Sequence, residues 1–118
     1  MAIKLNIPGL EHAETMIKKG VEVEHTSNNW EAVKPTVDDE LHYIEAHSLD
    51  EYGQWFLGIN TDAPVENRSK YVYPFGDFKV VQESALIIVE EVAGKKHQHE
   101  IKDVAHKLLT KIVHSKKQ

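Results

Sequence analysis

Apolar residues recur at helical spacing near both ends of the chain. Between Leu10 and Lys19 they fall every three or four residues, after Pro8-Gly9 and before Gly20, which predicts a short amphipathic helix. Residues 101–113 carry the most regular pattern of this kind and predict a longer closing helix. Its apolar positions are Ile101, Val104, Ala105, Leu108, Leu109, Ile112 and Val113.

Another helix is predicted from Thr36 to about His47. Thr36 can cap the first turn, and the acids at 38–40 lie where the helix dipole favours negative charge. Its apolar positions share one face: Val37, Leu41 and Ile44. Ser48-Leu49-Asp50-Glu51 then has the pattern of a capping box, which predicts a short helical turn ending at Gly53.

Three stretches are typical of β-strands. Residues 21–25 alternate apolar and polar side chains before the turn-rich run at 26–29. Residues 54–59 and 70–73 are bulky and rich in β-forming types, and we expect them to pair as an antiparallel hairpin. The loop between these two strands is longer than a tight turn and leaves room for a turn of helix around Pro64.

A central helix is predicted over residues 78–93, with Asp77 as its cap and Gly94 as its stop. Its apolar stripe consists of Phe78, Val81, Ala85, Ile88, Val89 and Val92. The alternative interpretation makes residues 86–92 and 98–101 two strands around Gly94, because several of these side chains are β-branched. The length of the periodic stretch favours the helix.

Together these elements predict an α+β fold that is mostly helical, with about four helices and a small antiparallel β-hairpin. At 118 residues, 41% hydrophobic and 28% charged, the chain has the size and composition of one globular domain over 1–118. We expect flexible ends at 1–3 and 115–118.

The composition also excludes some chemistry. There is no cysteine, which rules out disulfides, thiolate metal sites and a cysteine nucleophile. The first residues lack the apolar run of a signal peptide, and no window approaches the length of a membrane span. We therefore expect a cytoplasmic protein with no membrane partner.

Charge is distributed unevenly along the chain, whose net charge is −5. Residues 1–94 sum to −10, whereas residues 95–118 sum to +5. Either the basic closing helix neutralises the acidic body, or its lysines bind a polyanion such as nucleic acid. The first explanation is favoured because an acidic body repels a phosphate backbone. The lysines concerned are Lys102, Lys107, Lys111, Lys116 and Lys117.

Histidines near the C-terminus offer a candidate metal site. His97 and His99 could present two imidazoles to one ion, with His106 and Asp103 on the following helix as the nearby further ligands. A pair of histidines in a loop is more often solvated, so we assign no metal ligand and no cofactor.

Two acid–base pairs are candidates for catalysis: His42 with Glu45, and His47 with Asp50 or Glu51. No nucleophile or oxyanion hole accompanies them, and the common hydrolase and nucleotide-binding motifs are absent. Exposed His and Glu on helices are ordinarily solvated, so we assign no catalytic residue.

Aromatic side chains gather in the predicted hairpin and in the turn that follows it. We select Trp55, Tyr71, Tyr73 and Phe75 as candidate binding residues, because such rings can form a platform for a peptide or for bases. The competing interpretation packs one face of the hairpin onto the helices, with these rings in the core.

Residues 51–58 (Glu-Tyr-Gly-Gln-Trp-Phe-Leu-Gly) and 70–79 (Lys-Tyr-Val-Tyr-Pro-Phe-Gly-Asp-Phe-Lys) carry a resemblance to known proteins. With their Trp-x-Leu-Gly and Pro-x-Gly-Asp-Phe segments, they resemble a group of small bacterial proteins of unknown function. The same pattern is distantly similar to a stretch in phage-type capsid maturation proteins. Where similar sequences have His-Arg, this chain has Gln82-Glu83, so no anion-binding role carries over. The resemblance implies a fold rather than an activity.

We therefore expect a small non-enzymatic interaction or structural module that contacts a protein partner or associates with itself. One alternative is a metal-assisted or acid–base enzyme that uses the C-terminal histidines. A further alternative is weak nucleic-acid binding through the basic closing helix.

Overall fold

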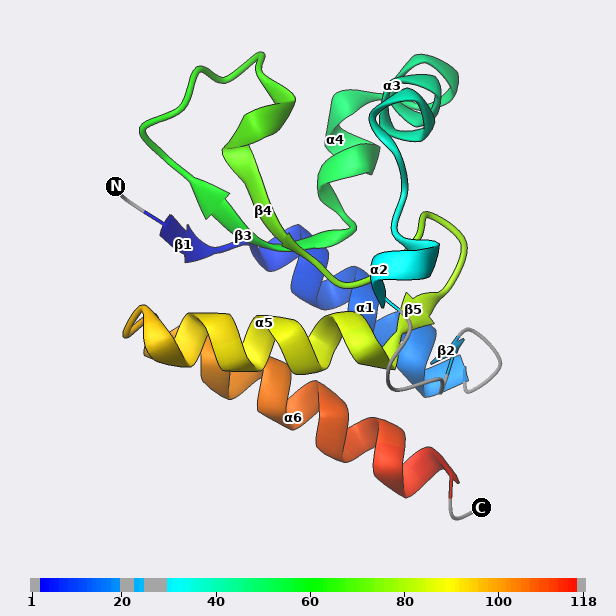
Figure 1. Cartoon of the computed structure of the whole chain (residues 1–118), viewed down its shortest axis with the longest axis vertical. Helices are drawn as coiled ribbons and strands as arrows, with labels where there is room; N and C mark the ends of the chain where they lie inside the picture. Colours follow the sequence, from blue (N-terminus) through cyan, green and yellow to red (C-terminus); the bar gives the residue numbers. More distant parts are fainter. Residues whose placement is uncertain (1–2, 20–22, 25–29, 117–118) are drawn as a thin grey trace.

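The structure is a computed structural model that describes residues 3–19, 23–24 and 30–116. Within these residues the helices and strands form one compact body (Figure 1). The α-helices are α1 (Ile7–Lys19), α2 (Trp30–Val33), α3 (Val37–Ala46), α4 (Leu49–Gly53), α5 (Glu83–Lys95) and α6 (His99–Lys116). The strands are β1 (Ile3–Leu5), β2 (Val23–Glu24), β3 (Phe56–Asn60), β4 (Tyr71–Pro74) and β5 (Val81–Gln82), and a 3₁₀ turn, η1, spans Arg68–Lys70. The predicted fold class, α+β and mostly helical, is confirmed.

Strand β3 is the centre of a three-stranded antiparallel sheet in the order β1-β3-β4. Phe56 lies opposite Pro74 and Gly58 opposite Val72, so the predicted hairpin is confirmed. Phe56, Leu57 and Gly58 are all buried, which means that both faces of the strand are covered. Strand β1 pairs with the free edge of β3, and Ile3 lies opposite Asn60.

Helices α1, α5 and α6 form the layer that covers the sheet. Figure 1 shows α5 and α6 running antiparallel, with α1 beside them. The buried stripe of α6, which consists of Ile101, Ala105, Leu108 and Ile112, packs into one core with Leu86, Val89 and Ala93 of α5. Each burial of this kind contributes about 1.5–3 kcal/mol per large apolar side chain. The predicted closing helix is confirmed, as is the first helix, which begins slightly earlier at Ile7.

A close approach fixes α1 against β3. Gly9 is buried, and a Cβ atom placed there would lie 1.8 Å from the carbonyl oxygen of Phe56. The preceding Asn6 is also buried, and its side-chain Nδ2 donates to the carbonyl oxygens of Gly53 (2.8 Å) and Phe56 (2.9 Å). These bonds satisfy backbone acceptors between α4 and β3 that would be costly to bury unpaired.

The predicted start of the central helix is wrong. Helix α5 begins at Glu83, and Gln82 precedes it without a side-chain cap. Asp77, the predicted cap, instead closes a turn, because its Oδ1 accepts from the backbone N–H groups of Lys79 (3.1 Å) and Val80 (3.0 Å). Phe78 has φ of 71°, which no helix accommodates, and residues 81–82 pair in parallel with β2.

Other predictions for the helices differ from the structure in detail. The alternative of two strands over 86–101 is wrong, because α5 and α6 occupy those residues. Helix α5 continues to Lys95, and the left-handed residue after it is His97 (φ 60°) rather than Gly94. Six α-helices occupy the described residues where about four were expected. Of the two short ones, α4 confirms the predicted helical turn, with Oγ of Ser48 accepting from the N–H of Glu51 (3.1 Å), and α2 was not predicted.

The chain ends and the long loop differ in part from the predictions. Ile3, expected in a flexible end, belongs to β1, which was not predicted, and α6 extends to Lys116. Of the predicted strand at 21–25, only residues 23–24 are described, and the run at 26–29 lies outside the described residues. The loop between β3 and β4 contains a turn at Pro64, whose carbonyl accepts from the N–H of Asn67 (3.0 Å), followed by η1.

Among the helices of the described residues, none combines the length and the apolar character that spanning a bilayer requires.

Candidate functional site

None of the residues of α3 is buried, and the helix attaches to the body mainly through polar and aromatic contacts, with the partly buried Ile44 also packed against the core. The Tyr52 hydroxyl of α4 donates to Oε2 of Glu40 (2.9 Å), and Arg68 lies 3.7 Å from Oε1 of the same carboxylate. Nε1 of Trp55 donates to the hydroxyl oxygen of Tyr43 (3.1 Å). Glu40 and Tyr43 are three residues apart, so one face of α3 makes these contacts.

A stack of three rings completes this attachment. Tyr43 lies between His47 and Phe78, with ring centroids 4.2 Å and 4.5 Å away and nearly parallel planes. Tyr52 and Trp55 contact the Phe78 ring from the core side, at 5.6 Å and 6.1 Å. These contacts offset the cost of the positive φ at Phe78, which is of the order of 1 kcal/mol. Its ring connects α3 to the core.

The environment shifts the pKa of three groups. Burial, together with the hydrogen bond to Glu40, raises the pKa of Tyr52 well above its usual value of 10. Burial also raises the pKa of Tyr73. Hydrogen bonds with the backbone and side chain of Thr36 lower the pKa of Asp39 below 3.8. In the capping box at the start of α3, the Thr36 N–H donates to Oδ2 of Asp39 (3.0 Å) and the Asp39 N–H donates to Oγ1 of Thr36 (3.1 Å). The predicted start of this helix is thereby confirmed.

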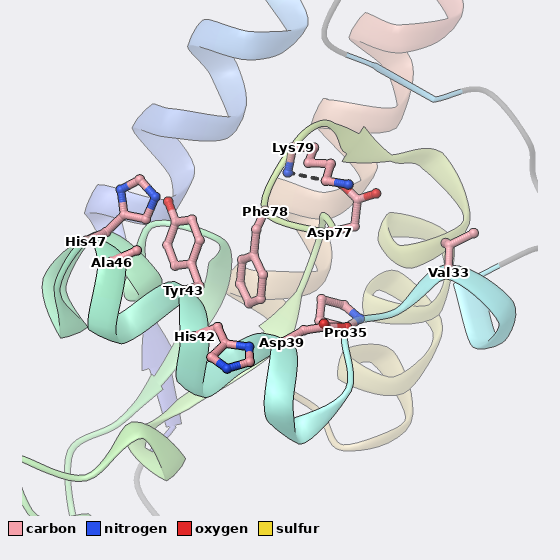
Figure 2. A pocket seen from close by; sticks show the side chains of 10 residues that line it. All are labelled: Val33, Pro35, Asp39, His42, Tyr43, Ala46, His47, Asp77, Phe78 and Lys79. Atoms are coloured by element: carbon pink, nitrogen blue, oxygen red, sulfur yellow. Dashed lines mark hydrogen bonds between the residues drawn. The ribbon is translucent and has the colours of Figure 1, made fainter.

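One flank of α3 lines a pocket of about 440 Å³, shown in Figure 2. The opposite wall is the turn that carries Asp77, Phe78 and Lys79. The two carboxylates of the lining already accept hydrogen bonds from their own turns: Asp39 from Thr36, and Asp77 from Lys79 and Val80.

His47, which lines this pocket, forms one of the predicted acid–base pairs. Its Nδ1 lies 3.1 Å from Oε2 of Glu51. Both side chains are about half exposed, so the pair is screened by water. The ten lining residues include no Ser, Thr or Cys, and the hydroxyl oxygen of Tyr43 already accepts from Nε1 of Trp55.

The other flank of α3 forms an open groove of about 560 Å³, which we call the α3 groove. Its apolar lining comes from α3, from α4 and from the loop before η1, and consists of Leu41, Ile44, Leu49 and Pro64. Glu66, Asn67 and Arg68 line it from the loop side.

Large apolar side chains beside this groove lie in solvent. Val37 is 57% exposed, Leu41 48% and Val65 77%. The apolar face predicted for this helix therefore exists, but only Ile44 also packs against the core, whereas Val37 and Leu41 stay about half exposed. The α3 contact surface, as we call it, consists of Val37, Leu41, Ile44, Leu49, Pro64 and Val65.

Two of the four predicted binding residues lie in the core. Trp55 is 4% exposed and Phe75 is fully buried, so neither reaches a contact surface. Tyr71 and Tyr73 are half-buried; Tyr71 packs against Phe56, and the Tyr73 hydroxyl donates to Oε1 of Gln98. The four rings thus pack within or beside the hairpin, and sequence reasoning did not single out the exposed apolar side chains beside the α3 groove.

The C-terminal histidines do not converge. The rings of His97 and His99 lie 6.0 Å apart, and Nδ1 of His106 lies 3.2 Å from Oε1 of Glu90. In the part of the chain that the structure describes, no three His, Asp or Glu side chains are placed to hold a metal ion.

A lysine of the basic helix pairs with the acidic body where Nζ of Lys111 lies 3.0 Å from Oε2 of Glu14. Helix α6 forms the lower edge of the molecule in Figure 1, whereas α3, α4 and the loop before η1 form the upper edge. The basic helix therefore does not cover the acids of α3 and α4.

Searches of the chain against protein-family models, curated protein sequences and solved structures find no match, so the resemblance of residues 51–86 to small bacterial proteins stays a prediction.

Proposed function

We propose that this protein is a non-enzymatic interaction module that contacts a partner protein through the α3 contact surface. The observation that carries the proposal is the orientation of α3. The helix docks through Glu40 and Tyr43, and it leaves Val37 and Leu41 about half exposed beside an apolar groove. Apolar side chains grouped in this way are typical of contact sites.

The α3 groove is preorganised by contacts within the chain. Glu40 ties α3 to α4 through Tyr52 and to η1 through Arg68. Nζ of Lys70 donates to the carbonyl oxygen of Val65 (2.6 Å), which closes the loop that forms the other wall. A preorganised surface loses less conformational entropy on binding, and this supports a contact role.

Size also supports a protein partner. Val37 and Ile44 are seven residues apart on α3, which corresponds to about 10 Å along the helix axis. Leu41 and Ile44 line the groove, and the exposed Val37 extends the apolar surface by one turn, so the whole surface accepts side chains from about two turns of a partner helix. The lack of cysteine fits a reducing compartment, and we place the module in the cytoplasm.

Site-specific photo-crosslinking tests this proposal. A benzophenone amino acid is placed at Leu41 and, as the control, at Val113 of α6, which is 45% exposed and lies on another helix. We expect Leu41 to give one discrete crosslinked product in cells and Val113 to give none. The product should disappear when Val37→Glu, one turn away, is added. Equal crosslinking from both positions, or a product insensitive to Val37→Glu, would contradict the proposal.

A further inference from the structure

We propose that the α3 contact surface selects one class of partner, a basic amphipathic helix of another protein. This inference rests on the proposed function and adds the chemistry of the partner. Its basis is the charge that surrounds the apolar groove.

The segment that builds the surface is acidic without interruption. Residues 35–67 contain eight Asp or Glu and no Lys or Arg. All but Glu40 are exposed: Asp38, Asp39, Glu45, Asp50, Glu51, Asp62 and Glu66. Such a concentration attracts cations to this end of the molecule.

The nearest cations are already engaged. Arg68 lies 3.7 Å from the Glu40 carboxylate. Nζ of Lys70 donates to the carbonyl oxygen of Val65 and lies 5.0 Å from the centre of the Tyr71 ring. Lys79, on the pocket side of α3, acts on Asp39. The eight acids of residues 35–67 outnumber these cations, so much of the positive charge is left for the partner to supply.

Acids and apolar side chains alternate on α3 in a way that matches an amphipathic helix. Asp38 and Glu45 lie one turn before and one turn after Leu41. Val37 and Ile44 lie at the same spacing toward the other side of the helix, and of these two Ile44 lines the groove. A partner helix with apolar anchors three or four residues apart fits the groove. Lysines or arginines at the edge of its apolar stripe then reach the carboxylates.

A second copy of this chain is a poorer occupant. Its basic helix, α6, already buries Ile101, Ala105, Leu108 and Ile112 in its own core. The exposed face of α6 would therefore offer lysines to the groove but not the apolar stripe that the groove needs. Nucleic acid is poorer still, because the acids repel phosphate and base stacking needs exposed rings that this surface lacks.

Direct binding to designed peptides tests the inference. The probes are three fluorescent peptides about 18 residues long: a leucine–lysine amphipathic helix, a leucine–glutamate helix with the same apolar stripe, and a lysine peptide without the stripe. Fluorescence anisotropy measures their affinity for the full chain, and sedimentation reports its oligomeric state. We expect only the leucine–lysine helix to bind, with an affinity that falls as salt rises.

Three variants separate the contributions of charge and apolar contact. Asp38→Lys with Glu45→Lys should weaken binding of the leucine–lysine helix by more than about tenfold, because two attractions become repulsions. Leu41→Glu should weaken it by a similar factor. The matched control, Glu11→Lys with Asp103→Lys, reverses two exposed acids on α1 and α6 and should leave affinity unchanged.

The outcomes distinguish this inference from the proposed function. Equal binding of the leucine–glutamate helix, lost in Leu41→Glu, would overturn the choice of a basic partner and leave the interaction module standing. If Leu41→Glu left the affinity for the leucine–lysine helix unchanged, both the inference and the proposed function would be overturned. A dimer that dissociates in Leu41→Glu would assign the surface to a second copy instead. Binding of the lysine peptide, which lacks the apolar stripe, would show that charge attraction alone is sufficient. This result would also overturn the inference.

Discussion

The hydrogen bond between Tyr52 and Glu40 is the contact whose removal reports most directly on how α3 is attached. Tyr52→Phe deletes the hydroxyl that donates to the Glu40 carboxylate at 2.9 Å and leaves the buried ring in place. Hydrogen bonds to charged groups contribute about 1.5–3 kcal/mol. We expect a loss near the lower end, about 1.5 kcal/mol, because Glu40 keeps Arg68 and some contact with water. Urea unfolding at pH 7 measures the difference.

The same bond gives the protein a specific response to alkali. The pKa of Tyr52 is raised in the folded state, so the unfolded chain loses this proton first, near pH 10. The stability that Tyr52 contributes is therefore complete below pH 10 and falls as the pH rises toward the folded pKa. Tyr52→Phe should unfold less steeply between pH 9 and about pH 11 than the native protein does.

A double-mutant cycle with Glu40→Gln isolates the bond from other effects of either change. Glutamine keeps the size of the side chain and removes its charge. A coupling free energy of about 1 kcal/mol between the two substitutions supports the attachment described for α3. The reasoning is refuted if Tyr52→Phe matches the native protein within about 0.5 kcal/mol and keeps its alkaline slope.

Other parts of the structure give further predictions. Gly9→Ala should destabilise the fold by about 3 kcal/mol, measured by urea unfolding, because its Cβ would meet the Phe56 carbonyl. Phe75→Ala should cost about 3–5 kcal/mol in the same assay, since the ring is fully buried. The pKa of Asp39 is lowered through Thr36, so the cap stabilises above pH 3.8 and weakens as the pH falls through the folded pKa. Asp39→Asn should lessen this acid sensitivity of the melting temperature.

Helical periodicity predicted the closing helix well because the apolar side chains of this helix all pack into one core. Ile101, Ala105, Leu108 and Ile112 all face the core formed with α5 and α1, so spacing and burial agree. The same reasoning placed Val37, Leu41 and Ile44 on one face and was right about the helix. It could not show that this face would border an open groove, because the contacts that dock α3 come from Tyr52, Trp55 and Phe78, which are distant in sequence.

Residues 77–82 illustrate how tertiary contact overrides local preference. The apolar spacing from Phe78 onward suits a helix, yet the Phe78 ring stacks on Tyr43 and its backbone takes a positive φ. Asp77 is a good helix cap by residue type and serves a turn instead. Two of the candidate binding residues are buried for a related reason: the rings of Trp55 and Phe75 fill the core. The eight acids and the lack of Lys and Arg in residues 35–67 are the sequence signal for the surface that we propose.

The unfolding free energy of Leu41→Glu tests the central claim most directly. An apolar residue on the core-facing stripe of a helix tolerates no carboxylate, and such a change would cost several kcal/mol. Because Leu41 is 48% exposed beside the groove, we predict a change within about 0.5 kcal/mol of the native value. A loss above about 2 kcal/mol would place Leu41 in the core and remove the surface on which the proposed interaction depends.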